Sequence, residues 1–171
     1  MPNFTPFFVE SKGQPISFKG NTVVRADKFP VKNGDTLIAS IEKTNADKRQ
    51  GFVIDITGYC KMNGEICKNG KRVRMLFWED TMPKQVKLKV FTKQNFIWIN
   101  NIWEEKGSYL SILQNGENVY RDKQITNYEV EGAAMIVEEM ENGRRYRCND
   151  RDPDEDFDDI IFTIQNLDQG S

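Results

Sequence analysis

Five Asn-Gly pairs punctuate this chain of 171 residues and constrain its fold more than any other feature. They lie at 33–34, 63–64, 69–70, 115–116 and 142–143. Both residue types tolerate positive φ, so each pair favours a tight turn between β-strands. Between the pairs run short segments in which apolar and polar residues alternate, as where Val86, Leu88 and Val90 are separated by lysines. The sequence therefore predicts an all-β protein.

Nine segments have the length and residue types of strands: 36–41, 51–56, 71–77, 85–91, 95–99, 110–113, 134–138, 144–148 and 160–164. No segment has a long helical period, and residues 115–128 resemble a long connection. Short strands separated by turns are typical of a sandwich or a barrel. We expect one β-sandwich domain over residues 1–171, jelly-roll-like, with an acidic loop and strand at about 132–166.

The composition removes several classes of function. The chain has no histidine, which excludes Ser-His-Asp and Cys-His catalysis and imidazole metal sites. No apolar run approaches the ~18 residues of a membrane helix. The first residues carry no secretory signal, since they lack a basic start and a long apolar core.

Three cysteines are present, and two of them, Cys60 and Cys67, flank the Asn63–Gly64 turn. Counting outward from that turn places them opposite each other, within reach of a disulfide in principle. The interpretation that we favour is two buried or half-buried thiols, since Cys148 would be left over.

Acidic residues crowd the C-terminal part. Residues 138–171 hold eleven acids and four arginines, a charge of −7, and since the whole chain carries −2 the remainder carries +5. Seven of the acids lie between residues 150 and 159, directly before an apolar strand. Like charges at that density on an ordered edge are costly unless a cation joins them. Carboxylate oxygens are the ligands that Ca²⁺ prefers.

We therefore predict a calcium site in which alternate acids of a curved loop converge, closed from across the sheet by two glutamates. The candidate ligands are Glu138, Glu139, Asp150, Asp152, Asp154, Asp156 and Asp159.

The segments 137–139 and 154–162 resemble a motif of bacterial surface modules, roughly F-E-D, a gap, then D-x-D-[FY]-N-D-x-V-[FL]. The resemblance covers about the last 30 residues. It implies a calcium-binding β-sandwich of secreted or adhesin-like proteins, with Glu138 and Glu139 at the E-D pair. Asp154, Asp156 and Asp159 match the acidic positions and Phe157 matches the aromatic one. The chain departs at Asp158, where the family prefers asparagine, and at Glu139, where it has aspartate.

Two other interpretations of the acids stay open. The loop can be solvated and neutralised by Arg144, Arg145, Arg147 and Arg151 in surface ion pairs of ~0–1 kcal/mol each. Alternatively, paired carboxylates beside Trp78 and Trp103 could serve a glycosidase, although tryptophans at such positions are more often packing residues.

A nucleic-acid interpretation also stays open. Residues 156–160 resemble the acidic tip of bacterial single-stranded-DNA-binding proteins, and the basic remainder with Phe91, Phe96, Trp98 and Trp103 could form a stacking groove. Against it, that tip is a free chain end, whereas here nine residues follow Phe162. We therefore expect nucleic acid to be the less favoured partner.

The function predicted from the sequence is a non-enzymatic, calcium-binding recognition or adhesion module. Its partner would be a glycan or a cell-surface protein, stacked on Trp78, Trp98 and Trp103. Calcium-dependent lipid binding at a membrane surface and a purely structural or assembly role are the further alternatives. Calcium favours an extracellular or surface address, whereas the missing signal peptide favours the cytoplasm.

Overall fold

The computed structural model describes residues 5–12, 14–46, 48–104, 109–114, 117–122, 134–149 and 157–168. Within them the chain is almost entirely β-strand, and its one helix is α1 (Thr5–Glu10). No described helix is long and apolar enough to cross a membrane.

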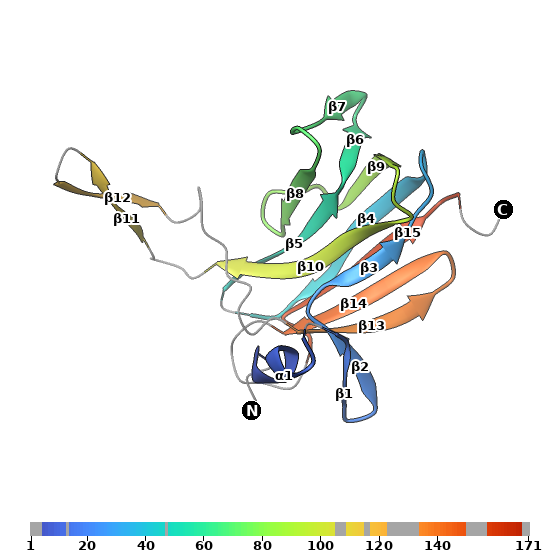
Figure 1. Cartoon of the computed structure of the whole chain (residues 1–171), viewed down its shortest axis with the longest axis horizontal. Coiled ribbons are helices and arrows are strands. Elements are labelled where there is room, and N and C mark those ends of the chain that lie inside the picture. The colour runs from blue at the N-terminus through green and yellow to red at the C-terminus, as the bar shows by residue number, and fades with distance from the viewer. Residues whose placement is uncertain are drawn as a thin grey trace.

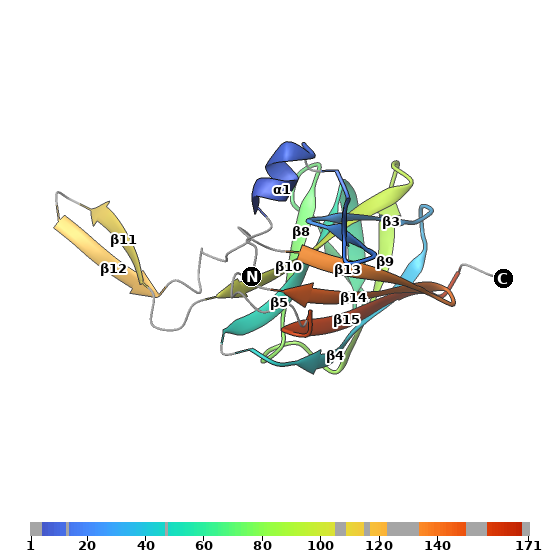
Figure 2. The same cartoon turned by 90° about the horizontal axis from the view of Figure 1, so that it is seen from below.

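The described strands form two antiparallel sheets that pack face to face, with a separate hairpin (Figures 1 and 2). The larger, sheet A, has nine strands in the order β1 (Ile16–Phe18), β2 (Asn21–Val24), β13 (Ala134–Met140), β14 (Gly143–Asn149), β15 (Ile160–Asn166), β4 (Thr36–Thr44), β9 (Gln85–Thr92), β6 (Gly58–Met62) and β7 (Glu65–Cys67). The smaller, sheet B, has four in the order β3 (Asp27–Pro30), β10 (Phe96–Glu104), β5 (Arg49–Ile56) and β8 (Val73–Trp78). The predicted all-β sandwich is confirmed, whereas this strand order does not establish jelly-roll connectivity.

A column of four aromatic rings joins the two sheets through the core. Phe77 and Phe52 come from sheet B, and their ring centroids are 5.2 Å apart. Phe52 stacks on Phe162 of sheet A at 4.3 Å, and Phe162 stacks on Tyr146 at 4.9 Å. Aliphatic side chains such as Leu37 and Ile54 fill the space around the column and are fully buried. On β9 the predicted alternation places Val86, Leu88 and Val90 in this core.

A second, smaller core lies on the outer side of sheet A. Phe8 of α1 packs there with Val23, Ala134 and Phe157, all buried. The helix and the β1–β2 hairpin therefore lie at one end of this outer face, and no other described element covers the rest of it.

The remaining two strands, β11 (Tyr109–Gln114) and β12 (Glu117–Asp122), pair only with each other among the described strands. In Figures 1 and 2 this hairpin stands away from the sandwich. β12 falls in the stretch that the sequence suggested was a long connection.

All nine predicted strands are found among the described residues. Six others were missed: β1, β2, β6 and β7 at the two ends of sheet A, β3 at the edge of sheet B, and β12 of the separate hairpin. The Asn63–Gly64 turn is confirmed, with φ of 52° and 78°. The turn near Asn142 lies one residue earlier than predicted, because Gly143 already pairs with Met140. Lys19 and Gly20 form an equivalent turn with φ of 49° and 82° that an Asn-Gly search cannot detect.

Candidate functional site

The two predicted metal-binding glutamates lie on β13 in ion pairs with arginines of β14. Glu138 is directly opposite Arg145 in the strand register, and its carboxylate contacts both Arg145 (3.5 Å) and Arg147 (3.4 Å). Glu139 accepts a hydrogen bond of 2.9 Å from Arg144. The carboxylates of Glu138 and Glu139 are thus neutralised by neighbouring guanidinium groups.

The other predicted ligands lie around the start of β15. Asp150, Asp152, Asp154 and Asp156 fall outside the described residues. Asp159 is buried, its backbone N–H donates to the carbonyl of Cys148, and burial together with the Asp159 charge raises the pKa of the Cys148 thiol. Its neighbour Asp158 accepts hydrogen bonds from Lys43 and Asn45 through Oδ2.

Within the described residues, no three acidic or cysteine side chains gather as a metal-binding group. Asp158 Oδ1 is nonetheless buried and accepts no hydrogen bond in the described part of the chain, which leaves an oxygen for a further donor or a cation. Calcium binding therefore stays a prediction.

If calcium binds here at a hundredfold excess over Kd, it should stabilise the fold by ~2.7 kcal/mol, raising Tm by about 5–10 °C over a chelator control. Differential scanning calorimetry with calcium, with magnesium and with chelator measures this shift. Asp156→Ala should remove the shift, and Glu65→Gln, which alters an exposed acid on β7, should keep it. An unchanged Tm for the wild type would contradict the calcium site.

The predicted ligand-binding tryptophans lie in three different environments. Trp103 is fully buried, facing inward from β10. Trp78 is half-buried beneath the guanidinium of Arg49, which lies 4.4 Å from the ring centroid. Trp98 is half-buried on the outer face of sheet B, near Phe96. These three side chains therefore do not gather into one sugar-stacking surface.

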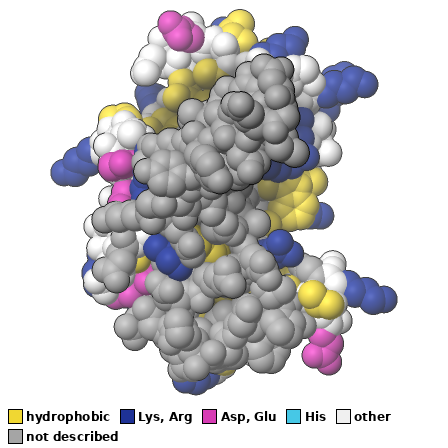
Figure 3. Space-filling view, turned by 90° about the vertical axis from the view of Figure 1, so that its left-hand side faces the viewer, with side chains coloured by type: hydrophobic (Ala, Val, Ile, Leu, Met, Phe, Trp, Pro, Cys, Tyr) yellow, Lys and Arg dark blue, Asp and Glu magenta, His cyan; other side chains and the backbone are white. Residues whose placement is uncertain are grey.

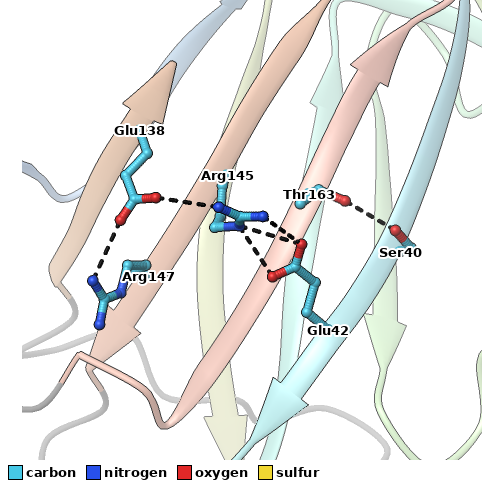
Figure 4. Close-up of polar contacts among 6 residues, drawn as sticks. All are labelled: Ser40, Glu42, Glu138, Arg145, Arg147 and Thr163. Carbon is cyan, nitrogen blue, oxygen red and sulfur yellow. Dashed lines mark hydrogen bonds and ion pairs between the residues drawn. The ribbon is translucent and has the colours of Figure 1, made fainter. Parts of the chain in front are cut away.

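The open part of the outer face of sheet A has two halves of different character. The first spans β13, β14, β15 and β4 and is an ionic ladder (Figure 4). Arg145 lies between Glu42 and Glu138, and its pKa is raised mainly by its hydrogen bonds to Glu42. Ser40 and Thr163 share a hydrogen bond of 2.9 Å beside it. Acidic and basic groups are balanced in this half.

The second half spans β9, β6 and β7 and carries lysines around a pair of aromatic rings. We call it the lysine face, and it consists of Tyr59, Lys61, Lys68, Lys87, Lys89 and Phe91. Tyr59 and Phe91 are cross-strand neighbours whose rings stack with centroids 4.8 Å apart. Both rings are half-buried, so each keeps accessible surface.

Three lysines of the lysine face stand over these rings. Lys89 Nζ lies 5.7 Å and Lys61 Nζ 6.0 Å from the Phe91 centroid, and Lys68 Nζ lies 6.0 Å from the Tyr59 centroid. Lys87 lies two residues before Lys89 in the sequence, so its side chain is on the same side of β9. All four lysines are exposed, and among the described residues none of them forms an ion pair with a carboxylate.

Lys61 and Lys89 are directly opposite each other in the register of β6 and β9. Like charges in that position are destabilising, by a fraction of a kcal/mol up to about 1. This exposed cross-strand lysine pair therefore lowers fold stability slightly.

Local sequence explains why the lysine face forms. Strict alternation on β9 sends Val86, Leu88 and Val90 inward and the lysines outward. The chain passes from sheet B to sheet A at Gly58, where φ is 147° and a Cβ would collide with the carbonyl of Phe91. Glycine therefore permits β6 to approach β9 closely enough for Tyr59 to stack on Phe91.

The inward side of β6 and β7 carries Cys60 and Cys67, which are in register as the sequence predicted, and both are free thiols. Burial, followed by the proximity of Cys67, raises the pKa of Cys60 to about 12. A thiol with such a pKa stays protonated near neutral pH, so Cys60 contributes to the core beneath the lysine face.

Positive charge alone does not define the lysine face. At the end of the molecule seen in Figure 3, Lys and Arg side chains also project around the described surface. The lysine face differs because its lysines surround stacked rings and, in the part of the chain that the structure describes, form no ion pairs with acids. Comparison of the chain with protein-family models, with curated proteins and with solved structures finds no match.

Sequence reasoning identified Phe91 and the basic remainder of the chain, but it missed Tyr59. The strand that holds Tyr59 is short and has no clean alternation, so it was not predicted. The available signal was the Asn63–Gly64 pair, because Asn-Gly favours a hairpin turn, which joins two paired strands.

Proposed function

We propose that this protein is a non-enzymatic binding module and that its lysine face binds single-stranded nucleic acid. The observation that supports this most is that Lys61 and Lys89, directly opposite each other and without a carboxylate partner among the described residues, lie over the Phe91 ring that stacks on Tyr59. The phosphates would form ion pairs with the lysine ammonium groups, and the bases would stack on the aromatic rings.

The charge of the lysine face favours a polyanion. Four exposed lysines without carboxylate partners in the described chain can each neutralise a phosphate and release its condensed counterion. The chain as a whole carries −2, so this positive charge is local. A neutral glycan would leave these ammonium groups without a counter-charge, and it is the weaker candidate.

The aromatic pair favours a single strand over a duplex. Base–aromatic stacking is worth ~1–3 kcal/mol per base, and it needs bases whose faces are accessible. The bases of a duplex are already stacked on one another, so a duplex could use the lysines but not the rings. In the ionic ladder beside the lysine face, the arginines are already paired with glutamates, and no aromatic ring is among the residues that form the ladder. The ladder therefore offers neither free positive charge nor a stacking surface.

A titration by fluorescence anisotropy tests the proposal directly. A labelled oligothymidine of about 12 nucleotides should bind more tightly than a duplex of the same length. If four phosphates are neutralised, log K should fall with log salt with a slope of about −3. Binding should be the same in calcium and in chelator, because the lysine face contains no metal ligand set.

Two outcomes would contradict the proposal. One is equal affinity for the single strand and the duplex, since the rings would then contribute nothing. The other is displacement by a sulfated glycan together with no loss of affinity in Phe91→Ala. That combination would indicate a general polyanion surface.

A further inference from the structure

A second cluster of rings and lysine lies on the other sheet, directly beyond the turn that follows Phe91. Phe96 and Trp98 project outward from β10, alternating with the buried Ile97 and Ile99. Their ring centroids are 5.6 Å apart in an edge-to-face arrangement. Both rings are half-buried.

One lysine serves both rings. Lys28 of β3 is directly opposite Trp98 in the register, and its Nζ lies 4.8 Å from the Phe96 centroid and 5.3 Å from the Trp98 centroid. Lys28 is exposed and, within the described chain, forms no ion pair. This cluster therefore repeats the composition of the lysine face: two adjacent rings with an exposed ammonium group over them.

The acid closest to this cluster in the register is not available to repel an anion. Asp55 of β5 is opposite Trp98, but its carboxylate is buried and held by Arg72 and Arg74. The two arginines neutralise the Asp55 carboxylate, so it should not repel an anion bound at Trp98.

A short turn connects the two clusters. Phe91 and Phe96 are five residues apart, so at most about 18 Å of extended chain separates them. Lys93, Gln94 and Asn95 of the turn are exposed. Hydrogen bonds fix the turn: Thr92 N–H donates to Asn33, Thr92 Oγ1 donates to the carbonyl of Thr57, and Val31 N–H donates to the carbonyl of Asn95.

We infer that Lys28, Phe96 and Trp98 form a second subsite for the same single strand, which runs from the lysine face over the β9–β10 turn past Lys93. This inference rests on the proposed function. The two clusters lie on the outer faces of different sheets, so the strand would bend around the end of the sandwich at the β9–β10 turn. A strand bound at one cluster would then hold its next nucleotides near the other at a raised effective concentration.

The test compares short and long oligothymidines, of about four and about 12 nucleotides, on the wild type and two variants. Trp98→Ala should weaken the long oligonucleotide roughly tenfold, but the short one by no more than about twofold, because the lysine face still binds it. Phe91→Ala should weaken the long oligonucleotide to a similar extent. Trp98→Phe should restore most of the affinity, since it keeps a stacking ring, and Lys28→Gln should make the salt slope shallower by about 0.7.

The outcomes separate this inference from the function on which it rests. Unchanged long-oligonucleotide affinity in Trp98→Ala, with a loss in Phe91→Ala, would overturn the second subsite and leave the lysine face standing. Two long oligonucleotides bound per protein would overturn the continuous path. No binding of either length to the wild type would overturn the proposed function itself. Thermal melting of Trp98→Ala close to the wild type establishes that a loss of affinity is not a loss of fold.

Discussion

Replacing Lys61 and Lys89 together by glutamate should abolish single-strand binding, with a loss of more than about 100-fold at low salt, or roughly 2.7 kcal/mol. Both ammonium groups stand over the Phe91 ring, so the change replaces two phosphate partners by two groups that repel phosphate. Both side chains are exposed, and the fold should remain intact. Fluorescence anisotropy with an oligothymidine, together with a melting curve, measures both quantities.

The matched control is Lys12→Glu with Lys84→Glu. These two lysines are also exposed and lie outside the lysine face, and the double change alters the net charge by the same amount. The control should lose only the part of the affinity that comes from long-range attraction, which salt screens. Equal losses in the two double variants would mean that net charge, and not the lysine face, governs binding.

The single variant Lys61→Glu should affect oligonucleotide affinity and fold stability in opposite directions. Lys61→Glu alone creates an opposite-charge pair with Lys89 across β6 and β9. It should therefore raise the free energy of unfolding slightly, by a few tenths of a kcal/mol, while it weakens binding. Opposite signs for the two effects cannot arise from a general folding defect.

The largest expected effect on stability is that of Phe162→Ala, a loss of ~3–5 kcal/mol in the free energy of unfolding. Phe162 is fully buried, and its ring is stacked between Phe52 of sheet B and Tyr146 of sheet A. Removing it leaves a cavity at the point where the two sheets meet and interrupts the aromatic column. Urea denaturation at equilibrium measures the loss.

Leu167→Ala is the control for that measurement. Leu167 directly follows β15 and is 48% exposed, so truncating it removes little buried surface. It should change the free energy of unfolding by less than ~1 kcal/mol. A loss below 1 kcal/mol in Phe162→Ala would contradict a core built around the aromatic column.

The fold was predictable because its signals are local. The Asn63–Gly64 turn and the alternation of β9 each act within a few residues, and the structure confirms both. Helix α1 and the strands β1 to β3 were not predicted, since they are short and carry no turn of the Asn-Gly type. Their positions depend on contacts with distant parts of the chain: Phe8 of α1 packs with Val23 and Ala134, β2 pairs with β13, and β3 pairs with β10.

The site was less predictable because it depends on register between distant strands. Tyr59 meets Phe91, and Lys61 meets Lys89, only when β6 pairs with β9 in one alignment. The predicted calcium site was subject to the same limit, because strand register also decides which groups lie beside its candidate ligands. Glu138 was predicted as a metal ligand, which stays a prediction, and the alignment of β13 with β14 adds that Arg145 lies directly opposite it. Charge counts along a sequence do not show which opposite charge lies next to which.

Binding of a single strand at the lysine face can be located by NMR, from the backbone amide chemical shifts as an oligothymidine is added. The shifts should concentrate on Tyr59, Lys61, Lys89 and Phe91, while those of Glu42 and Arg145 in the ionic ladder stay unchanged. Shifts concentrated on the ionic ladder, or no shifts on the lysine face at saturation, would contradict binding at the lysine face.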